Sequence, residues 1–227
     1  TLGQTLVSDA LVTYFQPALD KSTHEVVSGG IRKFVDELSM LCDPGVADCT
    51  GNGTPTLDQS LPLGVPDTTT YPGTDYYEIA LVQYREQMHS DLAPTLLRGY
   101  VQLSTSVVPG EQVQLTNANL DGTETVLTGY FGVTPPHYLG PTIVATKNRP
   151  VRIKFYNLLP TTAQGGNLFI PVDTTVMGSG MAPDGYGMVE LDPQNPMCGT
   201  TDAAMKAQMV ADGLCYSENR ATLHLHG

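Results

Sequence analysis

The alternation of apolar and polar residues changes near residue 76, and from there it predicts a series of short strands. Residues 77–88 combine aromatic and branched side chains over the length of a long strand. Residues 151–156 alternate strictly between apolar and polar, the pattern of a strand with one buried face. The expected strands are 77–88, 96–103, 113–115, 126–133, 142–146, 151–156, 168–172 and 221–226. Because strands greatly outnumber helices, we expect an all-β fold in the form of an antiparallel β-sandwich.

The first 75 residues are expected to form an extension to this strand-rich domain. Apolar side chains at positions 31, 34, 35, 38 and 41 share one helical face, which predicts a short amphipathic helix over residues 29–41. Residues 43–72 are rich in Pro, Gly, Thr and Asp and are expected to be loop. The sequence therefore predicts two parts, an extension over residues 1–75 and a domain over residues 76–227.

Two further features are expected inside the domain. Residues 142–146 and 151–156 flank a Lys-Asn-Arg-Pro turn, so they are expected to pair as a hairpin. Residues 174–219 form a long insertion rich in Gly and Met. Within it, residues 201–210 predict a helix capped by Thr200 or Thr201.

Composition narrows the possible functions. The chain has 227 residues, of which 41% are hydrophobic and 15% charged, so it can bury one large core. Its 23 glycines and 17 prolines suit strands joined by turns. The net charge of −12 repels phosphate backbones, so we expect no nucleic-acid partner. No run of 18 apolar residues occurs, and we expect no transmembrane segment.

The four cysteines fall into two close pairs, Cys42 with Cys49 and Cys198 with Cys215. An even number of paired cysteines predicts two local disulfides in an exported protein, although four free thiols in a cytosolic protein is an open alternative. The chain begins at Thr1 without an initiator methionine or a basic and apolar leader. We therefore expect a mature form in a periplasmic, cell-surface or extracellular setting.

Two histidines near the end of the sequence, His224 and His226, are the strongest candidates for chemistry. Side chains at i and i+2 of a strand project from the same face, so the two imidazoles are expected to point the same way. Parallel imidazoles suit a transition metal such as copper or zinc. Two ligands are too few to close a site, so the others must lie elsewhere. The alternatives are an exposed strand face that happens to hold two histidines, and a tag-like end with affinity for metals.

Four segments of the chain, taken in order, resemble a known family. They are residues 76–100 (YYEIALVQYREQMHSDLAPTLLRGY), 140–160 (GPTIVATKNRPVRIKFYNLLP), 169–173 (FIPVD) and 223–227 (LHLHG). Together they resemble the first cupredoxin domain of multicopper oxidases, most closely the branch of the spore-coat laccases and bilirubin oxidases. The resemblance covers residues 76–227 apart from the insertion, and it does not extend to residues 1–75.

This resemblance implies a cupredoxin-like Greek-key β-sandwich and a role for each histidine. His224 would bind the type 2 copper and His226 one copper of the type 3 pair, while Gly227 would let the backbone turn closely past the cluster. The other ligands of that cluster, and those of the type 1 copper, would belong to cupredoxin domains outside this sequence, in the same protein or in a companion chain. The four cysteines all precede the LHLHG motif, so none is a credible type 1 ligand.

The activity that the resemblance implies is that of a laccase. Such an enzyme takes single electrons from phenols, or from Mn(II), Fe(II) or Cu(I), and reduces dioxygen to water with four of them. No catalytic residue beyond the copper ligands is expected in this piece, which would be inactive without the remaining domains. Two alternatives stay open: a copper-binding module without turnover, such as a carrier or assembly partner, and an extracellular interaction or structural β-sandwich.

The remaining candidates receive structural interpretations. His89 is expected to make hydrogen bonds at a strand end, since no second ligand lies close to it in sequence. His24 and His137 are expected to be surface or loop residues. A Cu(I) site of thioethers is conceivable in the insertion, but its methionines are expected to fill gaps and its acidic residues to serve in turns. These residues are Met177, Met181, Met188, Met197, Met205, Met209, Asp184, Glu190 and Asp192.

Overall fold

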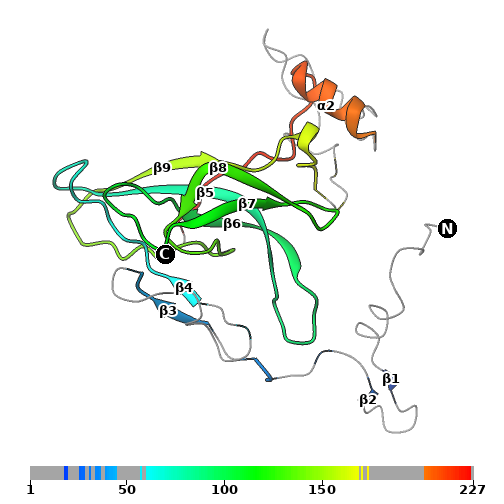
Figure 1. Ribbon diagram of the computed structural model, residues 1–227, viewed down its shortest axis with the longest axis horizontal. Helices are drawn as coiled ribbons and strands as arrows, with labels where there is room; N and C mark the ends of the chain where they lie inside the picture. The colour runs from blue at the N-terminus through cyan, green and yellow to red at the C-terminus, as the bar shows by residue number, and fades with distance from the viewer. Residues whose placement is uncertain are drawn as a thin grey trace.

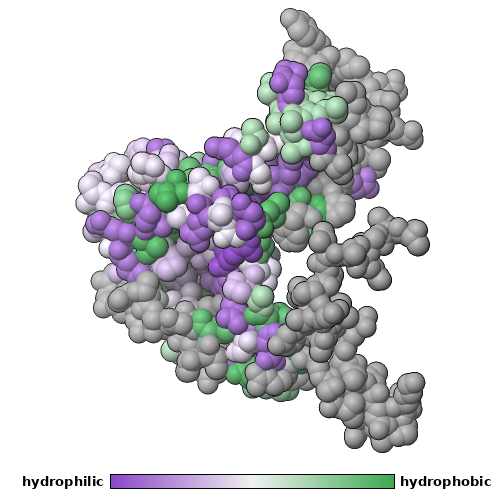
Figure 2. Space-filling model, turned by 45° about the vertical axis from the view of Figure 1, so that its right-hand side comes forward, coloured by the Kyte–Doolittle hydropathy of each residue, from purple (hydrophilic) through white to green (hydrophobic). Residues whose placement is uncertain are grey.

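The chain folds mostly into β-strands, as Figure 1 shows. The computed structural model describes residues 18–19, 26–28, 31, 34–36, 39–44, 57, 60–168, 170, 173 and 202–225. Within these residues helix is confined to one α-helix and one short 3-10 turn, so the expected all-β class is confirmed. Figure 2 shows apolar and polar residues interspersed over the described part of one face.

A three-stranded sheet forms the centre of the fold. Its strands lie in the order β6 (Thr95–Gln102), β5 (Asp75–Glu86) and β9 (Val151–Asn157), with β6 antiparallel and β9 parallel to β5. The central strand is buried along almost its whole length, because it lies between two neighbours and is covered on both faces. The strands expected over 77–88, 96–103 and 151–156 are therefore confirmed.

A hairpin packs across one face of this sheet (Figure 1). It consists of β7 (Val113–Ala118) and β8 (Glu124–Gly132), which confirms the strands expected over 113–115 and 126–133. The core between sheet and hairpin is formed by Ala80, Val82, Val101, Leu103 and Leu115. Burial of each of the larger of these side chains stabilises the fold by about 1.5–3 kcal/mol.

One buried amide ties the hairpin to the sheet. The Oδ1 atom of Asn117, on β7, accepts the backbone N–H of Gln83 at 2.8 Å. Its Nδ2 atom donates to the carbonyl of Leu158, just beyond β9, at 2.7 Å. Both partners are backbone groups of the three-stranded sheet or its continuation, so Asn117 satisfies polar groups that the core would otherwise leave unpaired.

The hairpin expected between residues 142–146 and 151–156 is wrong. Strand β9 pairs in parallel with β5, from Asp75 opposite Val151 to Leu81 opposite Asn157. Thr142 instead bridges Leu63 in parallel, and residues 143–146 lie outside any strand. Pairing with β5 gives β9 a long buried partner, whereas a hairpin would leave β5 with an uncovered edge. The Lys-Asn-Arg-Pro sequence does form a turn, but β9 pairs with β5 and not with the residues before that turn.

The N-terminal part also differs from expectation. Strands β1 (Ala18–Leu19) and β2 (Val26–Ser28) are antiparallel, and β3 (Met40–Cys42) pairs in parallel with β4 (Ser60–Pro62). The helix expected over 29–41 is wrong at the described residues, since its last positions belong to β3 and Phe34 has a φ of 58°. An amphipathic helix depends on an apolar surface to pack against, and Phe34 is 99% exposed. The expected loop over 43–72 contains β4.

Helix α2 (Ala203–Ala211) confirms the helix expected near 201–210. Its N-cap is Asp202, whose carboxylate accepts the N–H groups of Ala204 and Met205, so the cap expected at Thr200 or Thr201 is corrected by one residue or two. Thr200 and Thr201 themselves lie outside the described residues. The 3-10 turn η1 (Thr162–Gln164) lies beside α2. No helix of the described residues has the length and apolar character to cross a membrane.

Two short strands expected near the end of the chain are absent from the described residues that cover them. Leu168 and Ile170, from the strand expected over 168–172, lie outside any strand. Ala221 to Leu225 also lie outside any strand, so the strand expected over 221–226 is wrong at these five positions. Most of the insertion, residues 174–201, lies outside the described residues.

Candidate functional site

The segment that leads to the candidate ligand His224 runs across the three-stranded sheet and is hydrogen-bonded to it. The hydroxyl of Tyr100, on β6, donates to the carbonyl of Thr222 at 3.1 Å. The Nδ2 atom of Asn157, on β9, donates to the carbonyl of Asn219 at 2.6 Å. Tyr100 and Asn157 both pair with Leu81 of β5, so the two side chains come from one row of the sheet. Two strands, β6 and β9, therefore fix where this segment lies.

A second anchor lies at Glu218. The guanidinium of Arg98, on β6, donates to the carbonyl of Glu218 at 2.6 Å and to that of Gly166 at 2.8 Å. The carboxylate of Glu218 accepts the N–H of Leu168 at 2.6 Å and pairs with the ammonium of Lys206 on α2. Burial lowers the pKa of Arg98, and the nearby charge of Glu218 opposes that shift. This cluster joins α2, the turn after η1 and the segment before His224 to β6.

His224 itself is exposed, two residues beyond the anchored carbonyl of Thr222. Its neighbour Leu225 is 64% exposed. His226 and Gly227 lie outside the described residues, so the relative orientation of the two imidazoles stays a prediction. Across the described ranges, no three His, Cys, Asp or Glu side chains form a group that could hold a metal ion.

The cysteines and methionines are partly described. Cys42 and Cys215 are both buried and disulfide-bonded, whereas Cys49 and Cys198 lie outside the described residues. The pairing of Cys42 with Cys49 and of Cys198 with Cys215 stays a prediction. Met209 is buried and packs with Cys215, which agrees with a gap-filling role. Met205 is exposed. The other methionines and the acidic residues proposed for turns, from Met177 to Met197, lie outside the described residues, as does His24.

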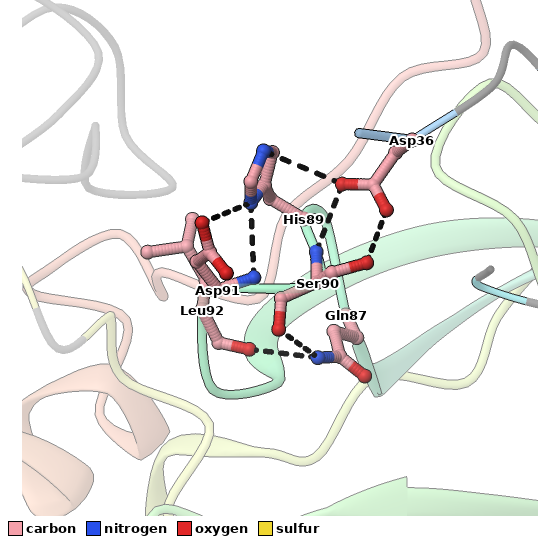
Figure 3. Close-up of polar contacts among 6 residues, drawn as sticks. All are labelled: Asp36, Gln87, His89, Ser90, Asp91 and Leu92. Carbon is pink, nitrogen blue, oxygen red and sulfur yellow. Dashed lines mark hydrogen bonds and ion pairs between the residues drawn. The ribbon is translucent and has the colours of Figure 1, made fainter. Parts of the chain in front are cut away.

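His89 belongs to a small polar cluster that joins the N-terminal part to the loop after β5 (Figure 3). The Nε2 atom of His89 lies 3.4 Å from the carboxylate of Asp36, and its Nδ1 atom accepts the N–H of Asp91 at 3.0 Å. Ser90 donates to Asp36 through both its backbone N–H, at 2.9 Å, and its hydroxyl. The hydroxyl bonds the carboxylate directly, so the group does not have the nucleophile and base arrangement of a hydrolase. Its contacts agree with the structural role expected of His89.

His137 lies outside the named strands, as expected of a loop residue, but it is not on the surface, because it is 5% exposed. Its backbone pairs with that of Tyr100, and its ring stacks on Tyr138 at 4.5 Å. The Nδ1 atom accepts the N–H of Leu139 at 3.1 Å, so the neutral imidazole carries its proton on Nε2. That atom lies 3.6 Å from the carboxylate of Glu86, which also accepts the hydroxyl of Tyr84. Burial of His137 is possible because this carboxylate faces it.

Replacing Glu86 with alanine is expected to lower the free energy of unfolding by about 2–4 kcal/mol, because the buried hydroxyl of Tyr84 loses its hydrogen-bond acceptor and the buried Nε2 atom of His137 loses the carboxylate that faces it. Burial lowers the pKa of His137, while the charge of Glu86 raises it. The folded state thus prefers neutral histidine, and stability is lost as pH falls below about 6.5, the pKa of an unfolded histidine. Glu86→Gln removes the opposing charge, so this loss should extend to lower pH. Urea unfolding at several pH values measures both effects, and equal pH dependence in Glu86→Gln and the native protein would contradict them.

Replacing Arg98 with alanine is expected to loosen the segment before His224. Two hydrogen bonds from a charged donor are lost, so amide hydrogen exchange over residues 216–222 should accelerate about tenfold or more. Arg85→Ala is the matched control, because Arg85 is exposed and also donates to a backbone carbonyl, but its acceptor is Asn119, just beyond β7, and not the segment before His224. Exchange measured by mass spectrometry that rises equally in both variants would show that Arg98 does not anchor the segment.

The residues that anchor this segment were not identified from the sequence. Arg98 and Tyr100 stand two apart in a mainly apolar strand, which indicates that both point away from the core face. This spacing could have indicated that both side chains make polar contacts outside the core, but it does not reveal their partners. Their partners, Glu218 and Thr222, lie more than a hundred residues away in the sequence.

Comparison with known proteins adds no family assignment. No protein-family model matches the sequence, and neither curated proteins nor solved structures give a match.

Proposed function

We propose that this chain is the N-terminal part of a laccase-like multicopper oxidase, one that couples one-electron oxidation of phenols or metal ions to the four-electron reduction of dioxygen. In this proposal residues 76–227 form a cupredoxin-like Greek-key sandwich. The ordered resemblance of four segments supports it, as does the strand-rich fold. The observation that carries it is the LHLHG end, where His224 is exposed just beyond a segment hydrogen-bonded to the sheet.

The residues present suit a copper site that is shared with another domain. Neutral imidazoles bind copper in both of its common oxidation states. A ligand that completes its site across an interface should be exposed when the facing domain is absent, and His224 is exposed. Because the described residues hold no complete metal group, the remaining ligands would come from other cupredoxin domains, which would also supply the type 1 copper. His224 would serve the type 2 copper and His226 the type 3 pair.

The contribution of this chain to the reaction is ligand binding and orientation. Copper, when bound, supplies the one-electron redox chemistry that dioxygen reduction requires. Tyr100, Asn157 and Arg98 fix the backbone of residues 218–222, which sets the position from which the imidazole of His224 projects. Hydrogen bonds from β6 and β9 hold the segment before His224, which keeps the donor atom close to its bound geometry before the metal arrives. The paired cysteines would place the protein outside the reducing cytosol, in a periplasmic, cell-surface or extracellular setting.

The test is copper content and oxygen uptake of the complete gene product. The protein is loaded with copper, passed through a desalting column, and supplied with a phenol, Mn(II), Fe(II) or Cu(I) as reductant. The proposal expects retained copper and reductant-dependent oxygen uptake that a copper chelator abolishes. Retained copper without oxygen uptake would instead indicate a carrier or assembly partner. Absence of retained copper would leave an extracellular structural sandwich, and either result would overturn the oxidase proposal.

A further inference from the structure

A carboxylate shared by two tyrosines lies on β5 and β9, away from the segment of His224. The hydroxyl of Tyr76 donates to Oε1 of Glu78 at 2.8 Å, and the hydroxyl of Tyr156 donates to Oε2 at 2.6 Å. Glu78 and Tyr76 come from β5 and Tyr156 from β9, which run side by side (Figure 1). Both oxygens of the carboxylate are therefore occupied by phenols, at distances typical of strong O–H···O⁻ hydrogen bonds.

The two phenols continue into further aromatic contacts. The rings of Tyr71 and Tyr76 lie 4.9 Å apart, edge to face, and those of Tyr130 and Tyr156 lie 6.3 Å apart. Tyr71 is 38% exposed, whereas Tyr76 is buried. The order Tyr71, Tyr76, Glu78, Tyr156 and Tyr130 thus forms a continuous series of contacts from the surface across the sheet. We call these five residues the tyrosine cluster.

The chemistry of this cluster differs from that of an ordinary packing cluster. The chain contains 11 tyrosines and no tryptophan, so tyrosine is its principal oxidisable aromatic side chain. Removing an electron from a phenol makes its proton strongly acidic, so oxidation is easiest when an acceptor for the proton is already hydrogen-bonded. Burial and the bonds to Glu78 raise the pKa of Tyr76 and of Tyr156, so both phenols keep their protons at neutral pH. The carboxylate is then available as the proton acceptor.

Two positively charged side chains, Lys154 and Arg152, lie against rings of the tyrosine cluster. The ammonium of Lys154 lies 4.7 Å from the ring centre of Tyr156, and the guanidinium of Arg152 lies 4.1 Å from that of Tyr71. The charge of Glu78 raises the pKa of Lys154, as does the hydrogen bond between Lys154 and Tyr156, which is the larger cause. Lys154 thus keeps its positive charge beside the ring of Tyr156.

We propose that the tyrosine cluster is a one-electron relay in which Glu78 takes the phenolic proton. An outer-sphere one-electron oxidant of high potential takes one electron from Tyr156, and the oxidation state of the oxidant falls by one. The O–H bond of Tyr156 breaks, its proton forms an O–H bond with Glu78, and a neutral tyrosyl radical remains. An electron from Tyr76 then refills the radical on Tyr156, the proton on Glu78 returns to Tyr156, and the phenolic proton of Tyr76 passes to Glu78, so that the radical now lies on Tyr76. A phenolic reductant at the exposed ring of Tyr71 supplies one electron to Tyr76 through Tyr71 and releases its own proton to water, while Tyr76 recovers its proton from Glu78. This relay does not rest on the copper proposal.

The experiment uses a photogenerated ruthenium(III) polypyridyl complex as the oxidant and follows tyrosyl radical formation by transient absorption and by electron paramagnetic resonance. The native chain is expected to show a fast phase of radical formation whose rate is independent of buffer base between about pH 6 and 8, because the proton acceptor is internal. Glu78→Gln keeps the shape of the side chain but should slow this phase about 100-fold. Tyr156→Phe should remove the share of the phase that arises at Tyr156.

Tyr216→Phe is the matched control, since Tyr216 lies under the guanidinium of Arg220 and outside the cluster, and it should leave the fast phase unchanged. Circular dichroism establishes whether each variant is folded. If Glu78→Gln does not fold, Tyr156→Phe provides the test. A fast phase that survives in both variants, or that depends on buffer base in the native chain, would overturn the relay and leave the cluster as packing alone. Neither result depends on copper binding, so the relay can be wrong while the oxidase proposal stands, and the reverse also holds.

Discussion

Replacing His224 with alanine in the complete protein is expected to reduce copper-dependent oxygen uptake more than about 100-fold. Loss of a residue that merely supports a metal ligand costs 10–100-fold in activity or affinity, and loss of the ligand itself should cost at least as much. Under the oxidase proposal His224 is itself a copper ligand, and the described ranges hold no group of three His, Cys, Asp or Glu residues that could bind the metal in its place. The fold should be unaffected, since His224 is exposed and lies outside any strand.

Leu225→Ala is the control for this variant. Leu225 is the next residue along the same segment and is 64% exposed, so its replacement alters the chain locally without removing an imidazole. Oxygen uptake with a phenol as reductant, measured by an oxygen electrode on copper-loaded samples, should remain near the native rate in Leu225→Ala. Equal losses in the two variants would mean that the segment matters only for structure. Full activity in His224→Ala would refute the ligand role.

Replacing Gly99 with valine is expected to lower the free energy of unfolding by about 3 kcal/mol or more. Gly99 lies in β6 at the point where the ring of Tyr84 crosses it. A Cβ atom there would contact that ring and would lie 2.9 Å from the carbonyl carbon and oxygen of His137. Backbone cannot move as a flexible side chain can, so either β6 or the bridge to His137 must shift. The shift would also separate Tyr84 and His137 from Glu86.

The comparison is Thr128→Val, which places the same side chain at an exposed position of β8 and should change stability by less than about 0.5 kcal/mol. Urea unfolding followed by circular dichroism measures both variants. If Gly99→Val unfolds at the native denaturant concentration, the close packing of β6 against residue 137 is not as described. A Gly99→Val protein that is soluble but unfolded would agree with the expected loss of stability.

The sequence predicted strands correctly where the pattern of apolar and polar residues was long and clear. Strands β5, β6 and β9 each carry a clear run or alternation, and the structure places all three in one sheet. Residues 142–146 and 29–41 failed for the opposite reason. Their local patterns were good, but residues 151–156, the expected partner of 142–146, pair with β5 instead. Of the described apolar positions 31, 34, 35 and 41, only Leu41 lies in a strand, and Phe34 is 99% exposed, so a packing surface for a helix is absent at that side chain.

The candidate site shows the same division. His224 could be proposed as a metal ligand from the sequence alone, because the spacing of two imidazoles and the resemblance of the surrounding segments both point to it, and this role stays a prediction. Its anchors could not, since Arg98 and Tyr100 reach partners 120 and 122 residues away. His137 was misjudged because nothing near it in the sequence reveals the carboxylate of Glu86, 51 positions earlier, that makes its burial tolerable.

Electron paramagnetic resonance of the copper-loaded complete protein, native and with His224→Ala or His226→Ala, tests the shared copper site most directly. The account predicts a Cu(II) signal with the nitrogen couplings of bound imidazole in the native protein. It predicts that His224→Ala removes the type 2 signal and that His226→Ala leaves that signal while disturbing the coupled copper pair. Spectra that are identical in all three proteins would contradict the account, because neither histidine would then bind the metal.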